Sequence, residues 1–126
     1  MKKAVFVLLC AAFAFGLTPN SAKAIKPFFD EFKAKYVKAD GSAEDKAFAD
    51  LVENKVKCNV CHKGKEKKDR NAYGKALDVL LDKKLDAKDK EKIQKALDTV
   101  AKQKSPEGPT FGDLIKEHKL PGGAEK

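Results

Sequence analysis

Residues 58–62 read Cys58-Asn59-Val60-Cys61-His62, and this C-x-x-C-H run is the stretch around which the rest of the chain is interpreted. Two cysteines three positions apart fall on one side of a helical turn, where both sulfurs can form thioethers with the vinyl groups of one porphyrin. The adjacent His62 then reaches the iron as a neutral imidazole. The run therefore predicts one haem c attached through Cys58 and Cys61, with His62 as the proximal ligand.

Three other interpretations of the same residues compete with haem attachment. A thioredoxin-like redox pair belongs near βαβ units, for which this sequence gives no pattern. A zinc site would use Cys58, Cys61, His62 and His118, but adjacent Cys61 and His62 fit the paired spacing of a zinc finger poorly. A simple disulfide across a tight loop is the last alternative. Haem attachment is favoured over all three.

The first 24 residues have the layout of a secretory signal peptide. A charged start, Met1-Lys2-Lys3, precedes an apolar run from Ala4 to Leu17, and Ala22-Lys23-Ala24 is a small-x-small cleavage site. The apolar run is too short for a membrane-spanning helix. We expect cleavage after Ala24, which leaves residues 25–126 as one monohaem domain in the periplasm or otherwise exported.

Removal of this leader has consequences for charge and for candidate ligands. The mature chain keeps 24 basic and 19 acidic residues, for a formal charge of +5. A lipoprotein anchor at Cys10 is disfavoured because Cys10 lies inside the apolar run. Cleavage removes Cys10 and Met1, so Cys58 and Cys61 are the remaining cysteines and no methionine is left to bind iron. Any membrane association would be peripheral.

The pattern after the leader is helical throughout. Apolar residues recur at helical spacing, and residues that favour helix N-termini precede most of these segments. No segment alternates apolar and polar residues over five or more positions. We expect an all-α, cytochrome c-like fold of four to five short helices wrapped around one covalent haem c. The expected helical segments are 27–38, 42–56 with a Ser42/Asp45 cap, 71–81 capped by Asn71, 86–101 with Asp86 and Asp89 at its start, and 110–115 with a Thr110/Asp113 cap.

The second axial ligand of the iron is the open question of the sequence. His118 is the other histidine, and it lies 56 residues beyond His62, far enough to cross to the distal face. It follows an apolar stripe on the last helix, although Glu117 and Lys119 favour exposure to solvent. We expect bis-His ligation by His62 and His118, with open coordination as the alternative and Lys, Asn or Tyr73 as minor possibilities.

Two further residues are candidates for binding the haem propionates. A buried phenol needs a hydrogen-bond partner, which makes Tyr73 the best candidate for a polar contact. Arg70 is expected to pair with the same carboxylates, as Lys75 could. For the phenylalanines and Tyr36, ordinary core packing is at least as good an explanation as contact with a porphyrin.

A basic loop follows the motif, and it bears on the choice of partner. Such a loop near the haem edge would steer a redox protein with an acidic docking surface, at rates that fall with salt. An exported chain without a recognition motif does not indicate nucleic-acid binding. An exposed apolar edge would also suit half of a homodimer or heterodimer. The loop contains Lys63, Lys65, Lys67, Lys68 and Arg70.

The motif and the helix pattern resemble the small monohaem c-type cytochromes of bacteria. The likeness to class I cytochromes c is at the level of architecture, and the motif does not lie near the C-terminus as it does in four-helix cytochromes c′. A more specific resemblance, to a planctomycete and anammox monohaem set, rests on four runs: Lys57–His62, Arg70-Asn71-Ala72-Tyr73-Gly74, Thr110-Phe111-Gly112-Asp113-Leu114 and Leu120-Pro121-Gly122-Gly123.

The resemblance implies a ligand pattern that this chain does not follow. Some members of that set pair the proximal histidine with a distal cysteine and bind nitric oxide. Here no third cysteine survives processing, so a distal cysteine is ruled out. The sequence favours a periplasmic electron carrier, not an enzyme. The alternative is a protein that binds or senses nitric oxide or carbon monoxide, and a peroxidase-like role lacks a separate acid–base group once His118 is used.

Overall fold

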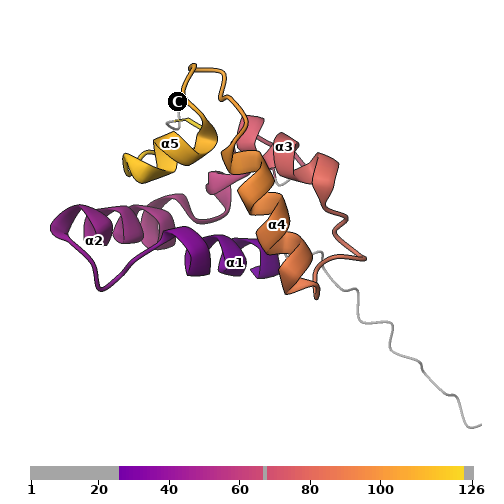
Figure 1. Ribbon diagram of the computed structural model, residues 1–126, viewed down its shortest axis with the longest axis horizontal. Coiled ribbons are helices and arrows are strands. Elements are labelled where there is room, and N and C mark those ends of the chain that lie inside the picture. Colours follow the sequence, from indigo (N-terminus) through magenta and orange to yellow (C-terminus); the bar gives the residue numbers. More distant parts are fainter. Residues whose placement is uncertain (1–25, 67, 124–126) are drawn as a thin grey trace, which may run out of the picture.

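A computed structural model describes residues 26–66 and 68–123, so the expected leader lies outside the described residues. Five α-helices follow one another along the chain, and the described residues contain no strand (Figure 1). Two isolated β-bridges, His62 with Arg70 and Lys104 with Thr110, are the extended pairings found there. The expectation of an all-α fold is confirmed. The helices are α1 (Lys26–Tyr36), α2 (Ala43–Asp50), α3 (Ala72–Leu80), α4 (Lys90–Ala101) and α5 (Phe111–Lys116).

The helices begin where the sequence places their N-terminal caps. Ser42 and Thr110 each form a capping box with the aspartate three residues later, which satisfies backbone donors at the starts of α2 and α5. Asn71 accepts a hydrogen bond from the Gly74 N–H at the start of α3, and Asp89 accepts one from the Lys92 N–H at the start of α4. These four caps confirm the expected starts of α2, α3 and α5, whereas α4 begins after Asp89 and the expectation that Asp86 also lies at its start is wrong, because Asp86 accepts a hydrogen bond from the Asp82 N–H in the preceding loop.

The approach to the motif differs from the single helix expected over residues 42–56. After α2 the backbone widens into a π-helical turn, η1 (Leu51–Val56), and then tightens into a 3₁₀ turn, η2 (Lys57–Val60). The spacing of Phe48, Val52 and Val56 does not distinguish a regular α-helix from a π-helical turn, because it would place all three side chains on the buried face of either one. Lys57, at the junction, has a φ of 50° and a ψ of −121°, a strained conformation for a residue with a side chain.

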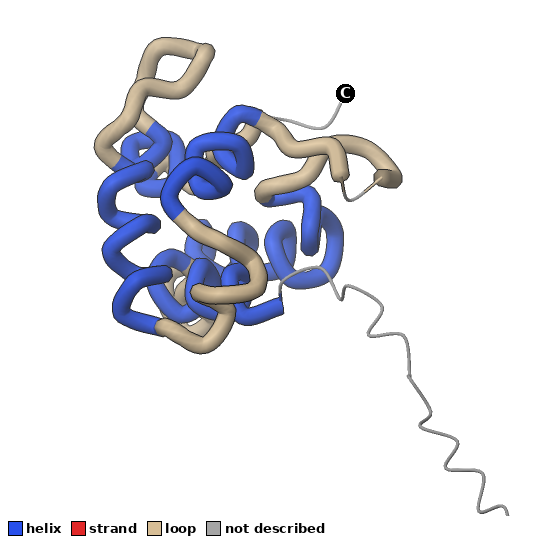
Figure 2. The backbone as a smooth tube through the Cα atoms, turned by 90° about the vertical axis from the view of Figure 1, so that its right-hand side faces the viewer, coloured by secondary structure: helices blue, strands red, loops and turns tan. Residues whose placement is uncertain are grey.

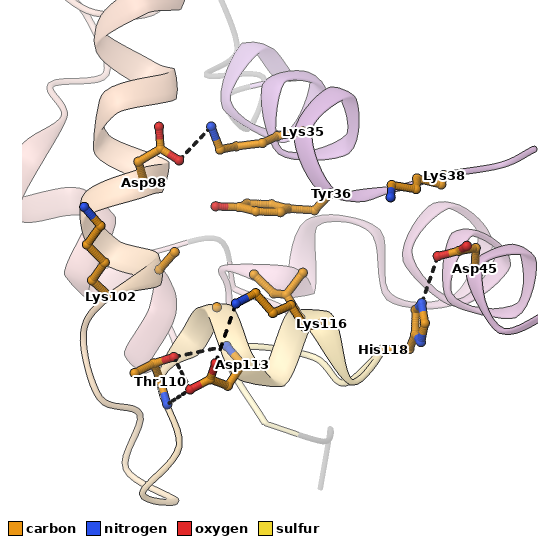
Figure 3. Close-up of a pocket in the computed structure, with 13 residues that line it drawn as sticks. Lys35, Tyr36, Lys38, Asp45, Asp98, Lys102, Thr110, Asp113, Lys116 and His118 are labelled. Carbon is orange, nitrogen blue, oxygen red and sulfur yellow. Dashed lines mark hydrogen bonds and ion pairs between the residues drawn. The ribbon is translucent and has the colours of Figure 1, made fainter. Parts of the chain in front are cut away.

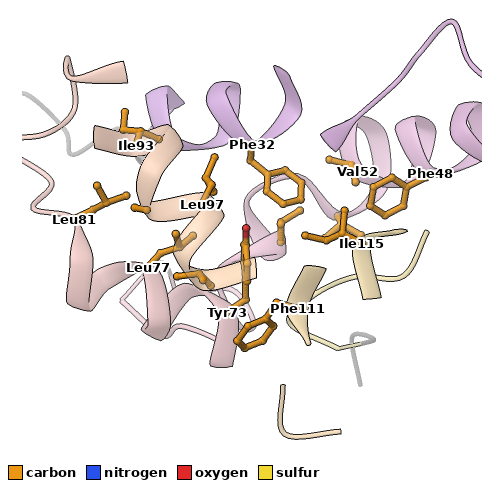
Figure 4. Close-up of a cluster of buried hydrophobic side chains, with 14 residues drawn as sticks. Phe32, Phe48, Val52, Tyr73, Leu77, Leu81, Ile93, Leu97, Phe111 and Ile115 are labelled. Carbon is orange, nitrogen blue, oxygen red and sulfur yellow. The ribbon is translucent and has the colours of Figure 1, made fainter. Parts of the chain in front are cut away.

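The hydrophobic core lies between α4 and the elements that surround it. α4 packs against α1, α3 and α5, and the connecting loops run over the outside of this group (Figure 2). Aromatic rings from α1, α3 and α5 meet in the centre (Figure 4). No helix of the described part is both long enough and apolar enough to cross a membrane. The largest fully buried side chains are Tyr73, Phe32, Ile93, Leu97, Val52, Val60, Val100 and Pro121.

Candidate haem-attachment site

The motif forms a single tight turn at the end of η2. The Cys58 carbonyl oxygen accepts hydrogen bonds from the backbone N–H groups of Cys61, at 3.3 Å, and His62, at 3.1 Å. These bonds draw the backbones of the two cysteines and the histidine into one turn. Both cysteines are partly buried, and neither is in a disulfide. The two thiols that thioether formation requires are therefore not held in a disulfide.

Asn71 ties this turn to the start of α3. Its backbone N–H donates to the Cys61 carbonyl at 3.1 Å, and its side-chain Nδ2 donates to the carbonyls of Val60 at 2.9 Å and Asn59 at 3.1 Å. The same side chain caps α3 through Oδ1, which accepts from the Gly74 N–H at 2.9 Å. One residue therefore fixes both the motif and the helix that follows it.

Gly74 allows this close approach of α3 to the motif. A Cβ atom at Gly74 would overlap the carbonyl oxygen of Cys61 and lie 2.8 Å from its carbonyl carbon. Backbone atoms cannot move aside as the end of a flexible side chain can. The run Asn71-Ala72-Tyr73-Gly74 is thus shaped by contact with the motif, although its first residue lies ten positions beyond Cys61.

Tyr73 carries a buried polar atom that the described residues leave without a hydrogen bond. Its side chain is fully buried, and its hydroxyl has no partner in that part of the chain. Burial, the nearby Cys61 thiol and Tyr36 raise the pKa of Tyr73 well above its usual value, so the phenol keeps its proton. A buried hydroxyl normally has a partner, and Tyr73 has none within the described residues. The propionates of a haem lie on the edge of the porphyrin opposite its vinyl groups, so propionate binding by Tyr73 stays a prediction, and the two cysteines outside any disulfide are the feature that fits haem attachment.

The Cys61 thiol lies in an environment that suits a neutral sulfur. Burial and the neighbouring Cys58 raise the pKa of Cys61 to about 12. A zinc ligand must be a thiolate, whereas a thioether carries no charge in any state. Within residues 26–66 and 68–123, no three His, Cys, Asp or Glu side chains assemble into a group that could hold a metal ion. The four-residue zinc set is therefore not brought together.

Arg70 lies beside the motif but has a protein partner. Its backbone forms the bridge with His62, and its guanidinium Nη2 lies 3.0 Å from the Asp78 carboxylate on α3. The proximity of Arg70 to Cys61 is reflected in the pKa of that thiol, which the guanidinium lowers against the larger effect of burial. Propionate binding by Arg70 stays a prediction, and it would have to compete with or share the ion pair to Asp78.

His118 lies at the C-terminal end of α5 and contacts α2. Its Nε2 is 2.9 Å from the Asp45 carboxylate, and its ring packs edge-on against Phe48 with centroids 5.7 Å apart. Its φ of 56° places it at the left-handed position that ends a helix, where glycine is the usual residue. The backbone N–H groups of His118 and Lys119 donate to the carbonyls of Ile115 and Leu114, which completes a Schellman motif. The role of His118 as distal ligand stays a prediction.

Two features of this site were missed from the sequence. Asn71 was identified as a cap, but its bonds to the motif were not; the available signal was the choice of Asn over Asp, since only the amide can donate to carbonyls. The Asp45–His118 pair joins residues 73 positions apart, and nothing local indicates it. Comparisons of the chain with protein-family models, with curated proteins and with solved structures found no match.

Proposed function

We propose that this chain is a periplasmic monohaem c-type cytochrome that passes single electrons between redox partners. Cys58 and Cys61 would hold the haem covalently, and His62 would be its proximal ligand. Bound in this way, a haem supplies a one-electron couple between ferric and ferrous iron. The observation that carries the proposal is the single turn of the C-x-x-C-H run, in which the backbone brings two cysteines outside any disulfide together with His62.

The proposal includes His118 as the distal ligand. A carboxylate on one ring nitrogen is a common way to fix the orientation of a ligating histidine. Because Nε2 contacts Asp45, ligation would use Nδ1, or else the contact with Asp45 would have to break. Two imidazoles give a six-coordinate iron that changes little between its oxidation states, which suits electron transfer, and a lower potential than a Met/His pair gives.

Expression of the full chain with a periplasmic haem-attachment system tests the proposal directly. We expect a pyridine haemochrome band and a haem-stained species that survives denaturing electrophoresis, because a covalent haem stays with the chain. Cys58→Ala and Cys61→Ala should each weaken this signal, and the double variant should lose it. A fully matured wild-type chain without any haemochrome band would refute the proposal.

A second function is favoured by the contact between His118 and Asp45. The His118 Nε2 is held 2.9 Å from the Asp45 carboxylate, and this contact competes with binding of the histidine to iron. An iron without a distal ligand would bind nitric oxide or carbon monoxide. The reduced protein should then show a carbon monoxide difference spectrum that His118→Ala leaves unchanged. Under bis-His ligation, wild type should bind carbon monoxide poorly and His118→Ala should bind it well.

A further inference from the structure

A groove of about 830 Å³ opens where α1, α4 and α5 come together, beside the contact between His118 and Asp45 (Figure 3). The ring of Tyr36 crosses it, and Ala101 and Ile115 contribute apolar surface to the lining. The Tyr36 hydroxyl donates to the Leu97 carbonyl at 3.3 Å, so the ring is held in place at the end of α1. None of the three motif residues lines this groove.

The charges around the groove leave positive groups available. Four lysines and three aspartates line it, and each aspartate already has a partner. Asp98 binds Lys35 at 2.8 Å, Asp45 binds His118, and Asp113 accepts from the Thr110 hydroxyl at 2.6 Å. Lys38 and Lys102 have no ion pair within the described residues, and they stand on opposite sides of the groove (Figure 3). An arriving carboxylate would therefore meet two uncompensated ammonium groups.

Packed aromatic rings connect this groove with the haem-attachment motif. Tyr73 precedes Gly74, which approaches the Cys61 carbonyl, and the Cys61 thiol helps to raise the pKa of the Tyr73 phenol. Its ring meets Phe32 with centroids 5.9 Å apart, and Phe32 meets Tyr36 with centroids 5.2 Å apart. Tyr73 and Phe32 are fully buried, and Tyr36 is the member of the series that reaches the groove. The series is a continuous path of closely packed rings from the motif to the surface.

We propose that the groove is the docking site for an acidic redox protein, and that electrons pass between it and the motif along Tyr73, Phe32 and Tyr36. This inference rests on the proposed electron-transfer function. A haem held at the motif would give up one electron, passing from ferrous to ferric iron, and the partner's centre would be reduced by that electron. No bond forms or breaks, and no proton moves.

Two other surfaces fit such a partner less well. The basic loop after the motif presents Lys63 and Lys65 to solvent, but residues 63–70 include no aromatic or aliphatic side chain for an apolar centre. The end of α3 exposes Val79 and the connection to α4 exposes Leu85, with exposed fractions of 84% and 80%. However, the four lysines of residues 75–89 are matched by four aspartates. The groove combines two lysines without an ion pair in the described residues, Lys38 and Lys102, with the aromatic ring of Tyr36.

Binding can be tested without reference to the haem. We would titrate ¹⁵N-labelled full-length protein with a hexaglutamate peptide at low salt and follow amide chemical shifts. The proposal predicts shifts concentrated at Lys38, Lys102 and Lys116, which weaken with salt and are lost in Lys38→Glu/Lys102→Glu. Shifts concentrated at residues 63–70 or 79–88 would overturn the assignment of the docking site, whether or not the chain carries haem.

Electron transfer is tested on protein whose haem content has first been shown by the haemochrome band. Oxidation of the reduced protein by ferricyanide, an anion, should slow at least about threefold more in Lys38→Glu/Lys102→Glu than in the matched control Lys63→Glu/Lys65→Glu. Both variants change the net charge by the same amount, so the difference reports the location of the charge. Equal slowing, or greater slowing in the control, would overturn the proposal.

Two substitutions of Tyr36 test whether electrons pass along the series of rings. Tyr36→Phe keeps the ring and should leave the oxidation rate near that of wild type, whereas Tyr36→Leu removes the ring and should slow it severalfold. Circular dichroism of both variants shows whether they fold. A folded Tyr36→Leu variant that exchanges electrons with ferricyanide as fast as Tyr36→Phe would refute the path.

Discussion

Replacement of Asn71 by alanine should lower the free energy of unfolding by about 2–4 kcal/mol, because the side chain makes two separate sets of hydrogen bonds. As the cap of α3 it contributes about 1 kcal/mol through the 2.9 Å bond from the Gly74 N–H. Its Nδ2 bonds to the Val60 and Asn59 carbonyls, at 2.9 and 3.1 Å, contribute about 1 kcal/mol each.

Two further substitutions at Asn71 separate these contributions. Asn71→Ser keeps an acceptor for the cap and loses the bonds to the motif, so it should recover about 1 kcal/mol relative to alanine. Asn71→Asp keeps the cap but turns a carboxylate oxygen toward the Val60 and Asn59 carbonyls, so it should be no better than serine. Asn54→Ala is the matched control, because within residues 26–66 and 68–123 its amide bonds to the exposed Asp50 side chain alone, and its change should stay within about 0.5 kcal/mol.

Urea unfolding followed by far-ultraviolet circular dichroism measures all four variants on one scale. The reasoning fails if Asn71→Ala stays as close to wild type as the Asn54→Ala control does. It also fails in part if Asn71→Asp matches wild type, because the donor bonds to the motif would then contribute nothing.

Three other predictions follow from the geometry of the site and of the core. Gly74→Ala should destabilise the fold by about 1–3 kcal/mol in the same urea assay and reduce haem attachment, because its Cβ meets the Cys61 carbonyl; full stability would contradict this contact. The Lys92 ammonium, 2.7 Å away, lowers the pKa of Asp86 below its ordinary 3.8. Stability from this group is therefore present above about pH 4 and lost on acidification, and Asp86→Asn should flatten the pH dependence of the unfolding free energy between about pH 5 and pH 2; an unchanged slope would argue against the pair. In haem-free chain at pH 8, iodoacetamide should modify Cys58 at least about tenfold faster than Cys61, whose pKa is raised to about 12, as mapped by mass spectrometry; equal rates would show that Cys61 is accessible.

The helices were predictable because their signals are local. Ser42 and Thr110 each stand three residues before an aspartate, and Ile93, Leu97 and Val100 repeat at helical spacing, so starts and buried faces follow from short stretches. The π turn before Cys58 and the 3₁₀ turn that contains Cys58 were not predictable, since Val52 and Val56 satisfy several helical pitches equally well. The sequence identifies Cys58, Cys61 and His62 by spacing alone.

The surroundings of the motif depend on contacts between distant residues. Tyr73 was correctly expected to be a buried phenol in need of a partner, because a tyrosine on an apolar helix face has that requirement wherever the helix packs. The groove around Tyr36 and the pairing of His118 with Asp45 arise only when α1, α2, α4 and α5 assemble. No short stretch contains both sides of these contacts, and the sequence therefore could not indicate them.

The partial burial of Cys61 bears on the order in which the proposed haem attachment and the folding of α3 take place. Under the proposed function, an enzyme that joins a porphyrin to this sulfur needs access to it, and the docking of α3 with Gly74 against the Cys61 carbonyl narrows that access. If the chain is exported as proposed, residues 58–62 would emerge before residues 71–74. Under the proposed function, attachment of the haem before α3 docks would then favour a complete product.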